Sequence, residues 1–391
     1  MRIIKLLSIL FVSIILIGCA GIYLTSRFVM ANLNQNLEYL NKQIASMASF
    51  YDFDFPFIND NPRFEYQTEE SGLFSEKGSL SIKFAQRTEV LPVTIDYGFL
   101  KAKISFALND YLHEDIQKRL AVSLKTINSA IKVSYSIFPY YYDAKFKLNG
   151  TYPDKEEEFS LFLSSHINIF DTLNFSFDVH SLYDKNDTSF KHFYLTGFTR
   201  KPGYLFNTAS VSGGMKDFDY AGFPFKDFKY DFIVTSLDSN DLAKVNYQID
   251  GKSLTPYVSS LFVNGNYGNF DLLKLNYPQD LISFNNFDKV LKDNKLDFSL
   301  DNLDACINPS FDASTKPQQD SFLTLRGEGK GLFMLEDLRK SDARFVLKLN
   351  KLPENNSVSE IVKEFFKLEN SEYYSVVEIK SGAIIINGKE L

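Results

Sequence analysis

The chain has no tryptophan, only two cysteines and only four histidines among its 391 residues. Cys19 lies inside an apolar run near the start, so it cannot pair with Cys306 within one folded chain, and zinc ligation by cysteines is excluded. The histidines lie at positions 113, 166, 180 and 192, and no two of them have His-x3-His spacing. The sequence therefore predicts no internal disulfide and no metal site.

Motifs of enzyme chemistry are also missing. There is no Gly-x-Ser-x-Gly elbow, no phosphate-binding loop and no Gly-x-Gly-x-x-Gly between a predicted strand and helix. Acidic pairs such as Asp301 and Asp304 are expected by chance among 49 acidic residues. We therefore expect no catalytic residue and no cofactor. A hydrolase of envelope polymers, which needs two acids facing one cleft, is the least favoured function.

The charge balance disfavours nucleic acid as a partner. The formal net charge is −7, whereas phosphate binding needs clustered lysine and arginine. The chain is instead rich in aromatic residues, with 38 Phe and 22 Tyr, which favour pleated, half-buried surfaces.

Apolar and polar residues alternate along much of the chain. This alternation is typical of antiparallel strands with one buried and one wet face. It predicts a mainly β fold of extended antiparallel sheet with a few short helices over residues 51–391, in one domain or two lobes. The clearest alternating segments are 173–180, 228–235, 243–250, 296–301 and 345–350.

Turn and helix signals divide the predicted strands. Dipeptides that suit hairpins occur at 149–150, 250–251, 264–265 and 387–388. Helices are expected over 113–125, over 278–292, and from a capping box at 357–360 to position 368.

Residues 6–24 carry no charge, and no other stretch of the chain is comparably apolar. As a helix this run is about 28 Å long, close to the hydrocarbon thickness of a bilayer. It predicts an anchor over 1–26 that contacts the lipid bilayer through residues 6–24. Arg2 and Lys5 precede the run and only Arg27 follows it closely, which favours a cytoplasmic N-terminus. The expected location is the bacterial inner membrane, with the bulk of the chain in the periplasm.

Cys19 provides an alternative anchor. Leu16–Cys19 is similar to a bacterial lipobox, in which cleavage before the cysteine leaves it lipidated. The apolar run continues to Leu24, which favours an uncleaved helix, but a lipoprotein anchored at Cys19 stays open. Either anchor tethers the chain to a membrane outside the cytoplasm.

The anchor is expected to continue as a stalk helix over residues 27–50. Apolar residues with heptad spacing predict a stripe along this helix. The stripe can lie against its own domain, which we favour, or form a weak homodimer through residues 33–47. Its members are Leu33, Leu37, Leu40, Ile44 and Met47.

Three segments, in order, resemble the YdgA-like bacterial envelope proteins, a family of unknown function. One is the anchor end at 21–25, and another is the C-terminal segment 381–389. The third comprises 66–80 with 94–98, where Ser71, Tyr97 and Phe99 replace the family's Arg, His and Pro. The resemblance implies an inner-membrane-anchored periplasmic protein without an established activity. The matching residues are Gly72, Phe74, Ser75, Asp96, Gly98, Gly382, Asn387 and Gly388.

Two functions are favoured. The first is a non-enzymatic structural or interaction protein of the envelope. The second is a module that binds lipid or another hydrophobic ligand on a Phe-rich sheet face. Residues 138–142 can form an exposed aromatic patch at a membrane or partner surface, or simply a strand and a turn.

Overall fold

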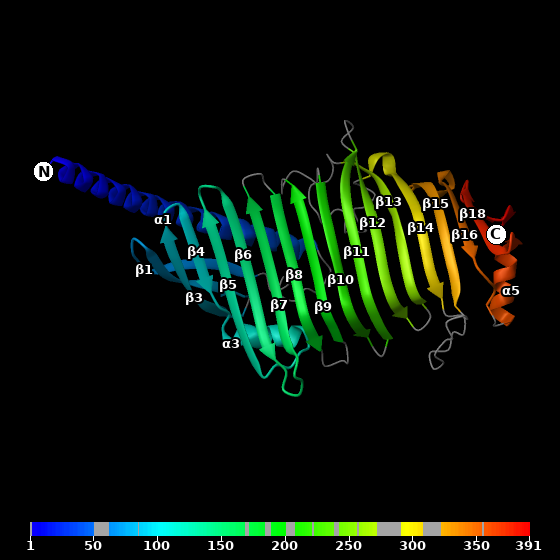
Figure 1. Ribbon diagram of the computed structural model, residues 1–391, viewed down its shortest axis with the longest axis horizontal. Coiled ribbons are helices and arrows are strands. Elements are labelled where there is room, and N and C mark those ends of the chain that lie inside the picture. Colours follow the sequence, from blue (N-terminus) through cyan, green and yellow to red (C-terminus); the bar gives the residue numbers. More distant parts are fainter. Residues whose placement is uncertain are drawn as a thin grey trace. The chain divides into compact units, whose positions relative to one another are not determined.

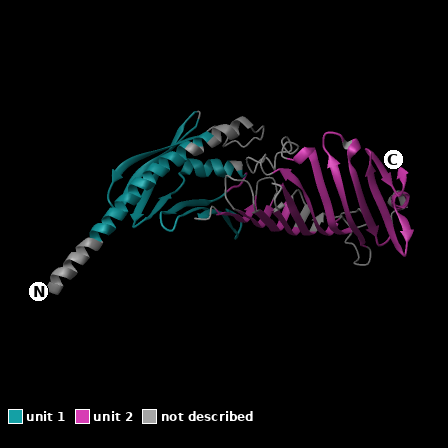
Figure 2. Ribbon diagram, turned by 90° about the horizontal axis from the view of Figure 1, so that it is seen from above, with its two compact units in different colours: residues 1–120, 124–169 teal, residues 121–123, 170–391 magenta. Residues whose placement is uncertain are grey.

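The computed structural model describes residues 2–50, 62–84, 86–168, 172–183, 189–200, 208–220, 223–237, 242–255, 258–271, 291–307, 322–353 and 356–391. The chain divides into two compact units, which we call unit 1 (1–120 with 124–169) and unit 2 (121–123 with 170–391; Figure 2). Both units are mainly β and antiparallel, which confirms the predicted fold class.

Helix α1 runs without a break over Arg2–Phe50 (Figure 1). It therefore contains the predicted anchor and the predicted stalk in one element. Within it, Ile15–Glu38 is long and apolar enough to cross a membrane, with a mean hydropathy of 1.4. The helix could thus insert into a bilayer, as an anchor or as a signal sequence.

Unit 1 contains an antiparallel meander in which each strand pairs with the next along the chain. The helix predicted over 113–125 is α3, Asp110–Arg119. It starts earlier because Asn109 caps it by accepting from the Leu112 N–H, and it ends before Ala121, which has φ 51°. The strands are β1 (Arg63–Ser71), β2 (Ser75–Lys83), β3 (Thr88–Gly98), β4 (Lys101–Phe106), β5 (Thr126–Ser136), β6 (Tyr141–Thr151) and β7 (Glu158–Asn168).

Helix α1 packs on one face of the unit 1 sheet. Val29 of the helix is buried against Val93 and Ile95 of β3, with Ala102 of β4 beside them. The heptad stripe thus begins on the helix's own domain. Burying each such side chain contributes about 1.5–3 kcal/mol, so this contact is strong enough to hold the helix on the sheet.

Unit 2 contains a second antiparallel meander. Its helices are short: α5 (Asn356–Phe365) and the 3-10 turns η1 (Lys292–Asn294) and η3 (Leu338–Lys340). Helix α5 overlaps the helix predicted from 357 to 368 but begins one residue earlier and ends at Phe365, whereas the helix predicted over 278–292 falls almost wholly outside the described residues. The strands are β8 (Thr172–Tyr183), β9 (Ser189–Arg200), β10 (Thr208–Tyr220), β11 (Phe223–Leu237), β12 (Leu242–Thr255), β13 (Val258–Asp271), β14 (Lys295–Ile307), β15 (Leu323–Met334), β16 (Asp342–Leu349), β17 (Lys367–Glu369), β18 (Glu372–Lys380), β19 (Ala383–Ile386) and β20 (Lys389–Glu390).

Three of the four predicted hairpin turns are wrong. Residues 149–150, 250–251 and 264–265 lie inside β6, β12 and β13. The fourth, Asn387–Gly388, turns between β19 and β20, with φ values of 50° and 83°. The glycine in β13 is required by a close approach: a Cβ on Gly265 would lie 2.0 Å from the Ser299 carbonyl oxygen.

Glycines and aromatic residues pair across the strands of unit 2. The bulk of each ring lies over a glycine on the neighbouring strand, where any side chain would collide with it. This explains why so many glycines occur inside strands of an aromatic-rich chain. The pairs are Phe175–Gly197, Tyr194–Gly214, Tyr230–Gly213, Tyr247–Gly265 and Phe345–Gly329.

Candidate functional site

An apolar groove of about 600 Å³ lies in unit 1 between α1 and the sheet. Val29, Leu33 and Leu37 line it from the helix. Leu33 and Leu37 belong to the stripe considered for a dimer, so these two positions face the protein's own groove. Each of the seven strands of unit 1 contributes to the sheet wall, which includes Phe64, Tyr66, Leu80, Phe106, Tyr135 and Ile167.

The strand register explains why these side chains share one face. Alternate residues of neighbouring strands point the same way, so opposed pairs form a continuous surface. Tyr66 opposes Leu80, and Tyr142 opposes both Tyr135 and Ile167. The groove therefore has an apolar sheet wall with two Phe and four Tyr among its described residues, and the helix covers this wall incompletely.

None of the described groove-lining residues is charged. Their polar atoms come from neutral groups, the amides of Asn32 and Asn36 and the hydroxyls of several tyrosines. Burial raises the pKa of Tyr135 and of Tyr142, so both rings stay neutral at physiological pH. Apolar walls with a few neutral polar groups suit a hydrocarbon ligand.

A buried carboxylate lies on the same face of β2 as groove residue Leu80. Glu76 is 4% exposed and accepts hydrogen bonds from Tyr66 (3.0 Å), Thr68 (2.7 Å) and Tyr97 (3.0 Å). Burial, and then the hydrogen bond to Glu76, raise the pKa of Tyr66 and of Tyr97 well above the usual value. The hydroxyls thus remain donors and tie β1, β2 and β3 together.

Sequence reasoning missed Glu76. The signal that could have revealed it is its position in the series 76, 78, 80, 82, where the other side chains are apolar or absent. A carboxylate at an inward position of a strand needs buried donors, and the neighbouring strands offer tyrosines at matching positions.

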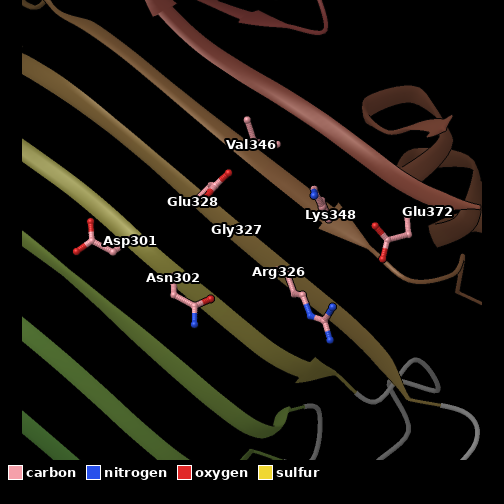
Figure 3. A pocket seen from close by; sticks show the side chains of 8 residues that line it. All are labelled: Asp301, Asn302, Arg326, Gly327, Glu328, Val346, Lys348 and Glu372. Atoms are coloured by element: carbon pink, nitrogen blue, oxygen red, sulfur yellow. The ribbon is translucent and has the colours of Figure 1, made fainter. Parts of the chain in front are cut away.

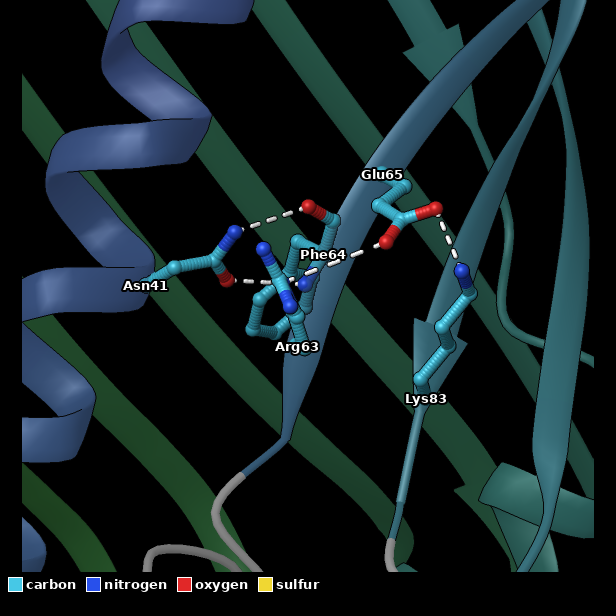
Figure 4. A network of polar contacts seen from close by, with 5 residues as sticks. All are labelled: Asn41, Arg63, Phe64, Glu65 and Lys83. Atoms are coloured by element: carbon cyan, nitrogen blue, oxygen red, sulfur yellow. Dashed lines mark hydrogen bonds and ion pairs between the residues drawn. The ribbon is translucent and has the colours of Figure 1, made fainter.

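Asn41 joins helix α1 to the edge strand β1 (Figure 4). Its amide nitrogen donates to the Phe64 carbonyl at 2.9 Å, and its amide oxygen accepts from the Phe64 N–H at 2.8 Å. The side chain thus replaces a neighbouring strand at this residue. Nearby, Glu65 forms exposed ion pairs with Arg63 and Lys83, which contribute little.

The structure brings together the two parts, 66–80 and 94–98, of one segment that carried the family resemblance. Gly72 and Phe74 form the β1–β2 turn, Ser75 opposes Asp96 across β2 and β3, and Gly98 ends β3. The Tyr97 N–H donates to the Phe74 carbonyl at 2.7 Å. Gly72 and Gly98 have no positive φ, so they are not left-handed turn residues.

The C-terminal segment 381–389, which also carried the resemblance, lies in unit 2. Asn387 accepts from the Val376 N–H and donates to the Phe365 carbonyl at the end of α5, at 2.9 and 2.8 Å. Gly382 and Gly388 have φ near 81° and 83°, which favours glycine. These residues hold turns and a helix end in place.

The cysteines and histidines form no metal centre among the described residues. Cys19 and Cys306 are both free and half-buried, so Cys306 is less buried than a core residue. His113 is buried with its ring 3.1 Å from the Ser129 hydroxyl, and burial lowers its pKa. His180 is exposed, as expected, and its ring lies 4.4 Å from that of His192.

A shallow polar hollow of about 190 Å³ lies on unit 2 (Figure 3). It includes Asp301 but not Asp304, which pairs with Arg326 at 3.5 Å. The other acidic residues, Glu328 and Glu372, come from different strands, and Figure 3 shows the carboxylates spread apart. The hollow therefore does not bring two acids to one reacting atom.

A scan against protein-family models and searches of curated proteins and of solved structures found no match to the chain. The resemblance to the YdgA-like envelope proteins stays a prediction that rests on the three segments above.

Proposed function

We propose that the protein is anchored in the inner membrane of a bacterium by α1, exposes its bulk to the periplasm, and binds the hydrocarbon chain of a lipid in the unit 1 groove. The observation that supports this most is the uncharged groove itself, because one of its walls is the helix that is apolar enough to enter a bilayer. The resemblance to YdgA-like proteins supports the envelope location.

The size and position of the groove suit such a ligand. Its volume of about 600 Å³ lies in the usual range for small-molecule sites. Each methylene group that leaves water for an apolar wall contributes about 0.8 kcal/mol. Val29 follows Leu24 by five residues, about 8 Å along the helix, so the groove begins close to the predicted end of the membrane span.

Native mass spectrometry of the full-length protein, extracted gently from its own membrane, tests the proposal. We expect a bound phospholipid mass in the wild type. Val133→Phe, which fills the groove, should lose it, and Val90→Phe, on an exposed strand position, should keep it. Both variants retain the anchor, so lipid bound around the anchor cannot produce this difference.

A second groove variant distinguishes loss of the binding site from a folding defect in Val133→Phe. Asn36→Asp changes little in size but places a charge in the lining, and it should also lose the lipid. Equal lipid occupancy in all four proteins would contradict the groove as the binding site.

A non-enzymatic structural or interaction role is the second candidate. The observation in its favour is a cross-strand row of charged residues in unit 2, where Lys330 opposes Arg344 and Arg344 opposes Glu378. A ligand-free mass for the wild type would favour this role over lipid binding.

A further inference from the structure

One end of the unit 1 sheet carries exposed apolar turns. We call Leu73, Phe74, Phe99, Phe138 and Tyr140 the apolar rim. Phe138 is 77% exposed, Phe74 61% and Phe99 52%. Large apolar side chains grouped in this way on a surface commonly mark an interaction site.

The rim residues come from three turns that lie side by side. In a meander, the β1–β2, β3–β4 and β5–β6 turns fall at the same end of the sheet. Backbone hydrogen bonds link them: the Tyr97 N–H donates to Phe74 at 2.7 Å, and the Ile137 N–H donates to Leu100 at 2.8 Å. Helix α3 lies at the opposite end of these strands (Figure 1).

The rim adjoins α1 within the predicted membrane span. The Phe99 ring lies so close to Gly21 that a Cβ there would be 2.3 Å from it. Gly21 is three residues before Leu24, so this contact lies about 4–5 Å inside the predicted end of the span. Next to it, Tyr23 accepts a hydrogen bond from Arg27, and such pairs of aromatic and basic residues are typical of a membrane–water interface.

We propose that the apolar rim inserts into the interface of the leaflet from which α1 emerges, between the phospholipid headgroups and the acyl chains. Apolar side chains on a membrane-bound surface reach about 5–10 Å into this region, which matches the depth at which Phe99 meets the helix. Exposed Lys101, next in sequence to the β3–β4 turn, can face anionic headgroups. The inference rests on the proposed anchoring by α1 and not on a ligand in the groove.

The absence of tryptophan makes a direct test available. A single Trp introduced by Phe138→Trp is the only Trp in the full chain. The protein is reconstituted into vesicles of phosphatidylcholine and phosphatidylglycerol whose acyl chains are brominated at defined depths. We expect the emission of this Trp to be quenched at least twofold, most strongly by bromine near the headgroups.

Three further variants separate the possible failures. Ile15→Trp, in the anchor, should be quenched most strongly by deeply placed bromine, and Val90→Trp, toward the other end of β3, should not be quenched. Loss of quenching at position 15 would overturn the anchoring. Quenching at 15 with none at 138, and none in the second rim variant Phe74→Trp, would overturn the inserted rim alone.

Discussion

Replacing Asn41 by alanine should loosen helix α1 from the unit 1 sheet. The substitution removes two hydrogen bonds and leaves the N–H and the carbonyl of Phe64 without their partner. Each bond contributes about 0.5–1.5 kcal/mol, so we expect a loss of about 1–3 kcal/mol in the free energy of unfolding of unit 1. For a unit of this size, that loss lowers the melting temperature by about 2–12 °C.

Hydrogen exchange provides a local measurement for the same variant. The Phe64 amide should exchange about 5- to 140-fold faster in Asn41→Ala, since each 1.4 kcal/mol changes an opening equilibrium about tenfold. Asn32→Ala is the matched control, because the Asn32 amide donates to the Phe28 carbonyl of its own helix at 2.8 Å and makes no hydrogen bond to the described residues of the sheet. Unchanged exchange at Phe64, or equal effects of the two variants, would refute the role of Asn41 as a link between helix and sheet.

Two further predictions concern the same sheet. Gly78→Ala should lower the free energy of unfolding by about 1–3 kcal/mol in thermal or denaturant melts, because its Cβ would lie 2.4 Å from the Gln67 carbonyl oxygen. Gly98→Ala, whose Cβ has no neighbour within 3.6 Å, should stay within about 0.5 kcal/mol of wild type, and similar losses for both would contradict the packing argument. The raised pKa of Tyr66 and Tyr97 predicts an alkaline loss of stability: the folded state holds these protons more tightly, so stability is full below pH 10 and falls as the pH rises above it. In urea melts between pH 8 and 11, the free energy of unfolding should fall less steeply with pH in Tyr97→Phe than in wild type. Identical slopes in the two proteins would count against the Glu76 cluster as the source of the alkaline loss.

The fold class follows from sequence because alternation requires only that one face of each strand be buried. The segments 228–235 and 243–250 lie in strands β11 and β12 for that reason. The dipeptides Asn149–Gly150 and Asn264–Gly265 were wrongly predicted as hairpin turns, because local turn preference is weaker than the need for a glycine where a neighbouring strand approaches closely. Whether a glycine serves a turn or a close approach depends on partners that lie far away in sequence.

The groove could be predicted only in part. The aromatic content indicated an apolar face, and the spacing of Leu33 and Leu37 indicated a stripe on the helix. That these two surfaces meet but leave a gap depends on the volumes of side chains from several strands. Likewise, the three donors to Glu76 come from β1 and β3, and only the strand register brings them to one carboxylate.

The continuity of α1 has a mechanical consequence. Its 49 residues form a rod about 74 Å long, with no break between the predicted span and the Asn41 link to β1. A spanning helix adapts to a thinner bilayer by tilting. If α1 spans the membrane as proposed, unit 1 is attached to the same helix and leans with it, so a change in membrane thickness changes the angle at which unit 1 faces the membrane.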